Sequence, residues 1–273
     1  MGRRRKSRRT RGRSNFVIPL VCLGILLLLA FITYMVYQST ITKSIKYDSV
    51  SMCRMGEEPT DLYAVLIDST ESLPNLSASQ AIIKVRNLLK NAPVNSQITL
   101  YSIQSGNERH VRPLATICKP ETGESASELT SNPYMIKKRF NDGFLIPLEG
   151  HLNSLVQGKG SETSPIIESL QSTVVESFES TQNTGNKKII VISDMIQNSD
   201  LYSFYRNKPN FEEYKELSNK TGIGVINLRG ISVELLVVPR KSSKVKRQDI
   251  IRFWREFLIG NNAALTSAMD PLS

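Results

Sequence analysis

The sequence has few of the side chains that most hydrolases use for catalysis. It contains two histidines, His110 and His151, and neither lies in a recognisable motif. It has no Gly-x-Ser-x-Gly turn, and serine hydrolase chemistry would also require a base beside the nucleophile. Walker-type loops and Gly-x-Gly-x-x-Gly fingerprints are absent too, so nucleotide binding has no support. We therefore expect a protein that is not an enzyme and has no small-molecule substrate.

Acidic side chains are missing from the first fifteen residues, which carry eight basic ones. The whole chain has 35 Lys and Arg against 25 Asp and Glu, so 27 basic residues face those 25 once residues 1–15 are set aside. The positive excess therefore belongs to this arm and not to a nucleic-acid-binding surface, and we expect no nucleic-acid partner.

Residues 16–37 contain no charged side chain and form the longest apolar run in the sequence. As a helix of 22 residues they would extend about 33 Å, enough to cross the hydrocarbon core of a bilayer. A cleaved signal peptide has a shorter apolar stretch of about 7–15 residues and ends in small residues, which the segment 34–38 (YMVYQ) lacks. We expect one uncleaved transmembrane helix at residues 16–37.

The position of the basic residues predicts the topology of the chain. Because basic residues favour the cytoplasmic side, residues 1–15 should form a cytoplasmic arm and everything after the helix should lie outside the cytoplasm. A single-pass protein of a bacterial inner membrane, with its domain in the periplasm, fits this pattern. We expect a juxtamembrane linker at 38–60, a folded domain at 61–262 and a C-terminal tail at 263–273.

The three cysteines fall in two different parts of the chain. Cys22 lies inside the apolar run, whereas Cys53 and Cys118 lie in the exported part. Outside the cytoplasm a disulfide between Cys53 and Cys118 would persist. Two separate buried thiols would satisfy the sequence equally, so it leaves both arrangements open.

The exported part alternates between apolar runs and amphipathic segments. Strands are expected at 61–67, 97–103, 111–118, 187–193 and 233–238, with the third near a sheet edge because Pro113 interrupts it. Helices are expected from 77 to 91, within 133–156, from Ser164-Pro165, near 211–217 and around 250–258, where Trp254 should belong to the core. This order predicts an α/β, Rossmann-like fold: a mostly parallel central sheet with helices on both faces.

Oxygen-bearing side chains cluster where the expected strands end. The segment Asp68-Ser69-Thr70-Glu71-Ser72 follows the first strand, Asp194 follows a later central strand, and Ser164 should cap a helix. In open parallel sheets ligands bind beyond the carboxyl ends of the strands. Carboxylates and hydroxyls without a nearby His or Cys suit a hard cation such as Mg²⁺.

These residues resemble the motifs of the von Willebrand factor type A domain. Asp68, Thr70 and Ser72 match its Asp-x-Ser-x-Ser motif, and Asp194 matches the Asp after its fourth strand. Ser164, before Pro-Ile-Ile-Glu, matches its central hydroxyl residue, which the family more often has as Thr.

The neighbouring Thr163 is the alternative to Ser164 for that position. The resemblance covers about residues 62–261. It implies a metal-ion-dependent adhesion site in which Mg²⁺, or Mn²⁺, stays partly open for an acidic residue of a protein partner.

Two residues depart from the family pattern. Met195 stands where a Gly usually follows the last Asp, and Glu71 stands where a small residue is usual. We expect Glu71 to face solvent, although it could cover the metal. The basic cluster of Arg240, Lys241, Lys244, Lys246 and Arg247 is expected to be a solvated loop.

Membrane anchor and motifs together predict a protein-binding or scaffolding module. One alternative is a metal-dependent phosphatase-like hydrolase on a similar sheet, although Thr70 stands where the Asp-x-Asp-x-Thr motif of haloacid-dehalogenase-like enzymes needs its second Asp. A second alternative is a passive structural subunit of a membrane assembly, with a vestigial metal site.

Overall fold

The computed structural model describes residues 17–41, 45–104, 111–124, 132–158, 160–179, 182–240, 244–264 and 268–272. The chain forms two compact units, Met1–Ile45 and Lys46–Ser273. The expected basic arm, His110 and Lys241 lie outside the described residues.

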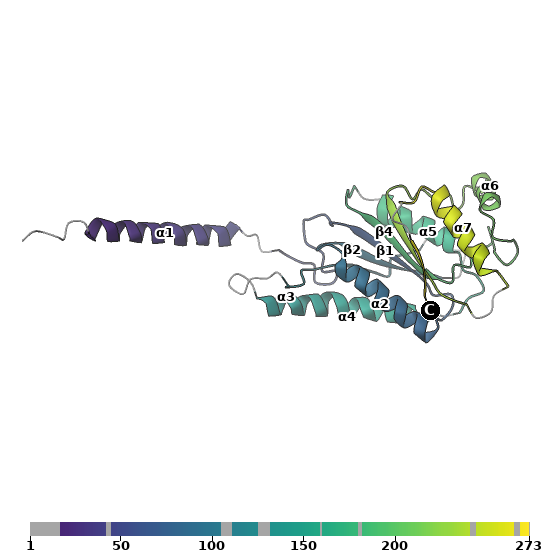
Figure 1. The fold of residues 1–273 in the computed structure, drawn as a ribbon, viewed down its shortest axis with the longest axis horizontal. Helices are drawn as coiled ribbons and strands as arrows, with labels where there is room; N and C mark the ends of the chain where they lie inside the picture. The colour runs from purple at the N-terminus through teal and green to yellow at the C-terminus, as the bar shows by residue number, and fades with distance from the viewer. Residues whose placement is uncertain are drawn as a thin grey trace, which may run out of the picture. The chain divides into compact units, whose positions relative to one another are not determined.

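The first unit contains a single described helix, α1 (Val17–Ile41), drawn in purple in Figure 1. Its segment Pro19–Tyr37 has a mean hydropathy of 2.5 and is not buried, and among the described residues it is the one helix long and apolar enough to cross a membrane. The apolar helix expected at 16–37 is therefore present and continues for about one further turn.

The second unit is built around a sheet in the order β3-β2-β1-β4-β5-β6. Its strands are β1 (Leu62–Asp68), β2 (Gln97–Ile103), β3 (Ala115–Cys118), β4 (Lys187–Ser193), β5 (Ile231–Val237) and β6 (Ala268–Pro271). All neighbours pair in parallel except β2 and β3. This order confirms the expected Rossmann-like α/β fold.

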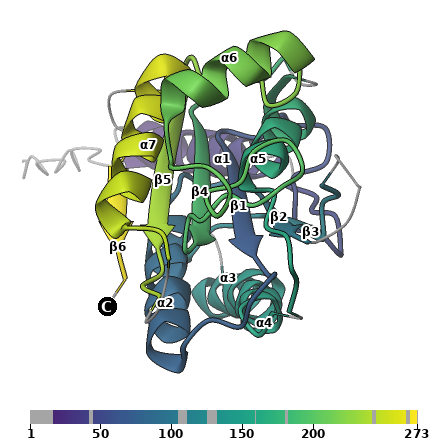
Figure 2. The same cartoon turned by 90° about the vertical axis from the view of Figure 1, so that its right-hand side faces the viewer.

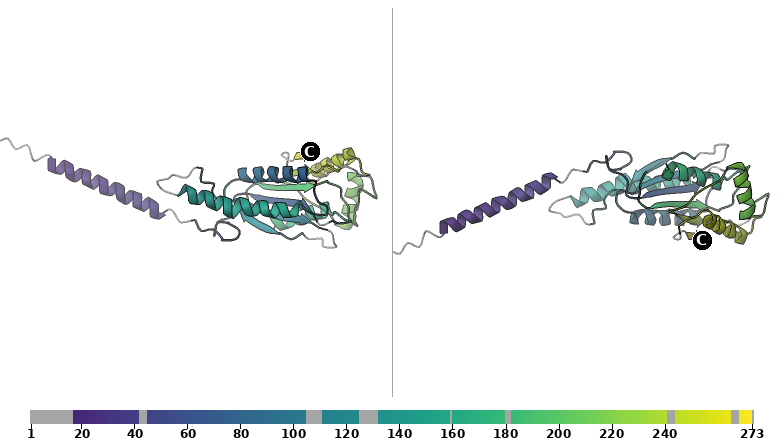
Figure 3. Two further views of the ribbon diagram at one scale, coloured as in Figure 1. Left: turned by 90° about the horizontal axis from the view of Figure 1, so that it is seen from below. Right: turned by 90° about the horizontal axis from the view of Figure 1, so that it is seen from above.

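Helices cover both faces of this sheet, as Figure 2 and Figure 3 show. One face packs against α2 (Asn75–Asn91), α3 (Pro133–Phe140), the π-helical turn η1 (Asn141–Leu145) and α4 (Ile146–Leu155). The other packs against α5 (Ile166–Val174), its π-helical extension η2 (Val175–Glu179), α6 (Phe211–Thr221) and α7 (Arg247–Gly260).

Alternate residues of β1 serve the two cores. Ala64 and Leu66 lie in the α5–α7 core, whereas Val65 and Ile67 lie in the α2–α4 core, as the two-residue period of a strand requires. Trp254 is fully buried in α7, as expected.

Three segments differ from the expected elements. The third strand starts at Ala115 and not at residue 111, after Pro113, which has no N–H for the ladder. Residues 133–155 form one continuous helical rod through η1. Residues 268–271 form the edge strand β6, although they were expected within the C-terminal tail. Their sequence, AMDP, has no strand pattern.

Residues 51–53 of the second unit are tied to the edge of the sheet. Cys53 and Cys118 are joined in a disulfide, which the sequence left open. The Cys118 N–H also donates to the Ser51 carbonyl oxygen at 2.7 Å. The edge strand β3 is thereby linked to residues 51–53.

Candidate metal centre

Asp68 ends β1 and is the hub of a hydrogen-bond network at the carboxyl edge of the sheet. It is buried, with 6% of its surface exposed. Its Oδ1 accepts hydrogen bonds from the Thr70 N–H at 3.0 Å and from the Thr70 hydroxyl at 2.5 Å. This local turn folds the loop back, so that the Thr70 hydroxyl lies against the carboxylate.

The second oxygen of Asp68 accepts from two serines on other segments. Ser164 Oγ donates to Oδ2 at 2.9 Å, and Ser193 Oγ, at the end of β4, donates at 2.8 Å. Sequence reasoning missed Ser193, although it directly precedes Asp194.

The expected helix cap at Ser164 is wrong. Helix α5 begins at Ile166, and its N-cap residue is Pro165, which has no side-chain oxygen to accept a hydrogen bond. The Ser164 hydroxyl is directed to Asp68 instead, and its main chain pairs with Asn198. The Gln197 Oε1 accepts from the Ile167 N–H at 2.9 Å and satisfies the helix end.

Asp194 follows β4 and lies in the same cavity as Asp68. Its Oδ1 accepts from the Ile196 N–H at 2.9 Å, and its Oδ2 lies 2.9 Å from Arg240 Nη1. Burial raises the pKa of Asp194 to about 6; the Ile196 N–H opposes this shift, the charge of Asp68 adds to it, and Arg240 opposes it.

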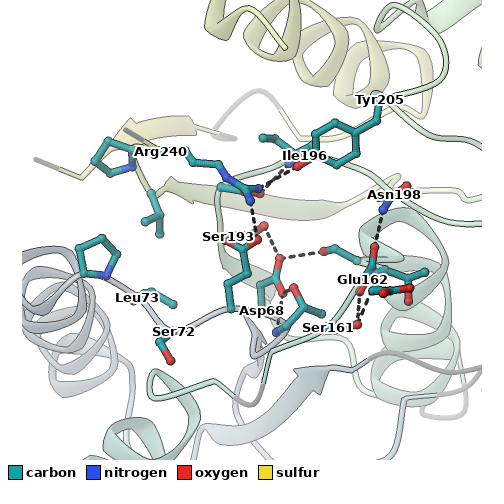
Figure 4. Close-up of a pocket in the computed structure, with 18 residues that line it drawn as sticks. Asp68, Ser72, Leu73, Ser161, Glu162, Ser193, Ile196, Asn198, Tyr205 and Arg240 are labelled. Atoms are coloured by element: carbon teal, nitrogen blue, oxygen red, sulfur yellow. Dashed lines mark hydrogen bonds and ion pairs between the residues drawn. The ribbon is translucent and has the colours of Figure 1, made fainter. Parts of the chain in front are cut away.

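Ser72 is oriented differently from the other expected ligands. It lines the cavity, but its hydroxyl donates to the Gln157 carbonyl oxygen, and Figure 4 shows it directed away from Asp68. Thr163 lines the cavity too, and its N–H donates to the Ser161 hydroxyl. Of the two alternatives for the central hydroxyl, the structure places Ser164 against Asp68.

Arg240 lies in an exposed loop, as expected, but its guanidinium also contacts the site. It follows β5 by three residues, and its guanidinium contacts Asp194, Glu71 Oε1 at 2.5 Å and the Tyr205 hydroxyl at 2.8 Å. Glu71 is half exposed, in line with the expectation that it faces solvent, and its carboxylate is also paired with Arg240. Burial lowers the pKa of Arg240, but its interactions with Asp194, Tyr205 and Glu71 more than offset this and raise it.

Arg240 had a usable signal in the sequence. It follows β5, a strand of the same parallel sheet as β1 and β4. Ligands bind beyond the carboxyl ends of such strands, so the residues after β5 are candidates for the site as well.

These groups enclose a cavity of about 350 Å³ that suits a hard cation. Thr70 and Ser164 donate their protons to Asp68 and keep lone pairs free on their oxygens, which is how hydroxyls serve as metal ligands. Among the described residues, no group of three or more His, Cys, Asp or Glu is placed to hold a metal ion by itself, so a cation here would depend on hydroxyls as well as carboxylates.

Comparison with known proteins gives distant structural likenesses. No family model matches the chain, and no curated protein sequence does. Similar solved structures include an aerotolerance-related membrane protein from Bacteroides fragilis, at 13% identity over 78% of this chain and 91% of that one, with a TM-score of 0.38.

Two further similar structures also have low identity. A von Willebrand factor type A protein from Catenulispora acidiphila shares 8% identity over 79% of this chain and 39% of that one, with a TM-score of 0.42. The manganese-loaded TRAP protein of Plasmodium vivax shares 12% over 79% and 69%, with a TM-score of 0.34. These likenesses are distant and concern the fold alone.

Proposed function

We propose that this chain is a membrane-anchored, protein-binding module whose domain engages a partner protein through a divalent cation. Asp68, Thr70, Ser164 and Asp194 would hold Mg²⁺ or Mn²⁺. The observation that carries the proposal is their convergence: three separate segments bring two carboxylates and two hydroxyls into one cavity at the carboxyl edge of the sheet.

Each of these residues has a distinct task in the proposed site. Asp68 accepts from Thr70 and Ser164 and thereby fixes the direction of both hydroxyls. Asp194, held through Oδ1 by the Ile196 N–H, offers Oδ2. Ser72 would join the set only after its hydroxyl leaves the Gln157 carbonyl. When bound, the cation would accept an acidic side chain of the partner as a further ligand.

The membrane arrangement belongs to the same proposal. Helix α1 would anchor the chain, with residues 1–15 in the cytoplasm and the domain outside it, in the periplasm of a bacterial cell. The disulfide between Cys53 and Cys118 supports an oxidising compartment for the domain, because such bridges are rare in the cytosol.

Metal binding is tested on the full-length chain in detergent micelles. Mn²⁺ is titrated and the free ion is measured by electron paramagnetic resonance, with Mg²⁺ as competitor. We expect one site that is lost in the Asp68→Asn, Asp194→Asn double variant and kept in Asp200→Asn, which removes an exposed carboxylate that does not line the cavity. Binding that survives the double variant would contradict the proposed ligands.

Partner binding is tested by crosslinking in native membranes, with and without chelator. The proposal expects a crosslinked protein that disappears on chelation and in the Asp68→Asn variant. A crosslink that persists under both conditions would favour the passive structural module with a vestigial site.

A further inference from the structure

A guanidinium group already lies against one face of the proposed metal site. Arg240 Nη1 donates to Asp194 Oδ2 at 2.9 Å and to the Tyr205 hydroxyl at 2.8 Å, while Nη2 donates to Glu71 Oε1 at 2.5 Å. Figure 4 shows the guanidinium between Tyr205 and the loop after β1. Three chain segments thus hold one cation in place.

We propose that Arg240 is a built-in counter-cation that competes with the divalent metal for Asp194, so that metal binding requires the guanidinium to release this carboxylate. The inference rests on the proposed metal-binding function and adds a regulatory element to the same site. It makes Arg240 the residue that sets how much free metal the site needs.

The competition is for one particular atom. The Asp194 Oδ1 is engaged by the Ile196 N–H at 2.9 Å, which belongs to the turn itself. Oδ2 is the oxygen left for a cation, and Arg240 holds that oxygen. A metal that used Oδ2 would place two positive groups against the same oxygen, and their repulsion would expel the group that is more free to move.

The charge balance explains why the site needs a counter-cation in the absence of metal. Asp68, Glu71 and Asp194 bring three carboxylates to the cavity, and Asp68 is itself largely buried. Like charges at close range in a partly desolvated site repel strongly. Arg240 offsets part of this repulsion and would become dispensable once a divalent cation supplies the charge.

The contacts of Arg240 are suited to release. Its side chain is 34% exposed and that of Glu71 is 54% exposed, and ion pairs at such exposed positions contribute little. Asp194, at 17% exposed, is the more buried partner. On leaving Asp194 the guanidinium can remain paired with Glu71 at the rim of the cavity.

The test uses Mn²⁺ affinity of the full-length chain in micelles for the wild type, Arg240→Gln, Tyr205→Phe and the combined variant. Removing the guanidinium should tighten Mn²⁺ binding about tenfold, because the repulsion between the guanidinium and the metal ion is lost. Tyr205→Phe changes no charge and removes only an acceptor that holds Arg240, so it should tighten binding about twofold. In the Arg240→Gln background it should have no effect.

A matched control separates this effect from the loss of any surface arginine. Arg86 forms an ion pair of 3.1 Å with Glu149 on the α2–α4 side, and Arg86→Gln should leave the affinity unchanged. Circular dichroism of each variant verifies that the fold is kept.

Each result has a definite meaning. Equal affinity of the wild type and Arg240→Gln, with binding still lost in the Asp68→Asn, Asp194→Asn variant, overturns the inference and leaves the proposed function standing. The same Tyr205→Phe effect in both backgrounds overturns it as well, because Tyr205 would then act without Arg240. Absence of binding in every variant removes the metal function and this inference together.

Discussion

The indole nitrogen of Trp254 donates a hydrogen bond of 2.8 Å to the main-chain carbonyl oxygen of Met195. Both residues are fully buried. Because Met195 directly follows Asp194, helix α7 holds the turn that orients the proposed ligand. Met195 has a φ of 63°, in the left-handed region that favours glycine.

The backbone of Met195 should be strained, and two substitutions separate this strain from packing. Met195→Ala should lower the free energy of unfolding by about 2–4 kcal/mol, because it deletes a buried side chain. Met195→Gly deletes slightly more but should be about 1 kcal/mol more stable than the Ala variant, since glycine adopts positive φ freely. Urea unfolding followed by circular dichroism measures both, and a Gly variant less stable than Ala would contradict the strain.

Gly158 supports the loop that carries Thr70 and Ser72. Its φ is 57°, and a Cβ added there would lie 2.6 Å from the Ser72 N and still closer to the Glu71 carbonyl group. A methyl group at this position must therefore displace the loop. We expect Gly158→Ala to lower both the unfolding free energy and the Mn²⁺ affinity.

Gly160 provides the matched control for this substitution. It also has a positive φ, of 77°, but a Cβ there would meet nothing within 4 Å. Gly160→Ala should therefore carry the backbone penalty of about 1 kcal/mol without the collision, and keep the Mn²⁺ affinity. If both variants weaken Mn²⁺ binding equally, the contact of Gly158 with the loop is not what positions the site.

The disulfide should contribute substantially to stability, because it closes a long loop. Cys53 and Cys118 are 65 residues apart, for which loop closure predicts about 4 kcal/mol. The Cys53→Ser, Cys118→Ser variant should lose most of this free energy in urea unfolding. Alkylation of the unreduced, denatured chain followed by mass spectrometry should modify Cys22 alone. Three modified cysteines without reductant would show that the bridge does not form.

The sequence predicted the fold well where periodicity is strong. The local pattern predicts β1, β4 and α7 as strands and a helix in this order. The apolar runs of the two strands and the apolar stripe of the helix must each be buried. The segment AMDP of β6 has no such pattern, and it becomes a strand because β5 offers it an open edge.

The convergence of the candidate residues could be predicted from the sequence, but their contacts could not. Asp68 and Asp194 meet because the strand ends of a parallel sheet share one edge, and Thr70 and Ser164 lie in loops at that edge. Arg240 bridges Glu71 and Asp194 through tertiary contacts that span 169 and 46 residues of sequence. The local sequence does not indicate which charged side chain will make such a contact. The direction of the Ser72 hydroxyl depends likewise on the Gln157 carbonyl.

Metal affinity should depend on pH through Asp194. Burial raises its pKa to about 6, so protonation of this carboxylate competes with the metal well above the range of an ordinary Asp. Ionised Asp194 would fall from about 90% at pH 7 to about 10% at pH 5, and Mn²⁺ affinity should fall about tenfold. A titration of affinity against pH should therefore bend near pH 6.

The raised pKa of Asp194 has the opposite effect on the stability of the metal-free protein. A carboxyl whose pKa is higher in the folded state than in the unfolded state favours folding when it is protonated, so the contribution of Asp194 to stability should improve as pH falls from about 7 towards 4. The unfolding free energy of the wild type relative to Asp194→Asn, measured at pH 5 and pH 7, isolates this contribution, because Asn cannot titrate.

Loss of metal affinity at pH 5 without loss of stability there would show that proton competition, and not unfolding, empties the site. An affinity that stays constant down to pH 5 would place the titrating carboxylate outside the ligand set.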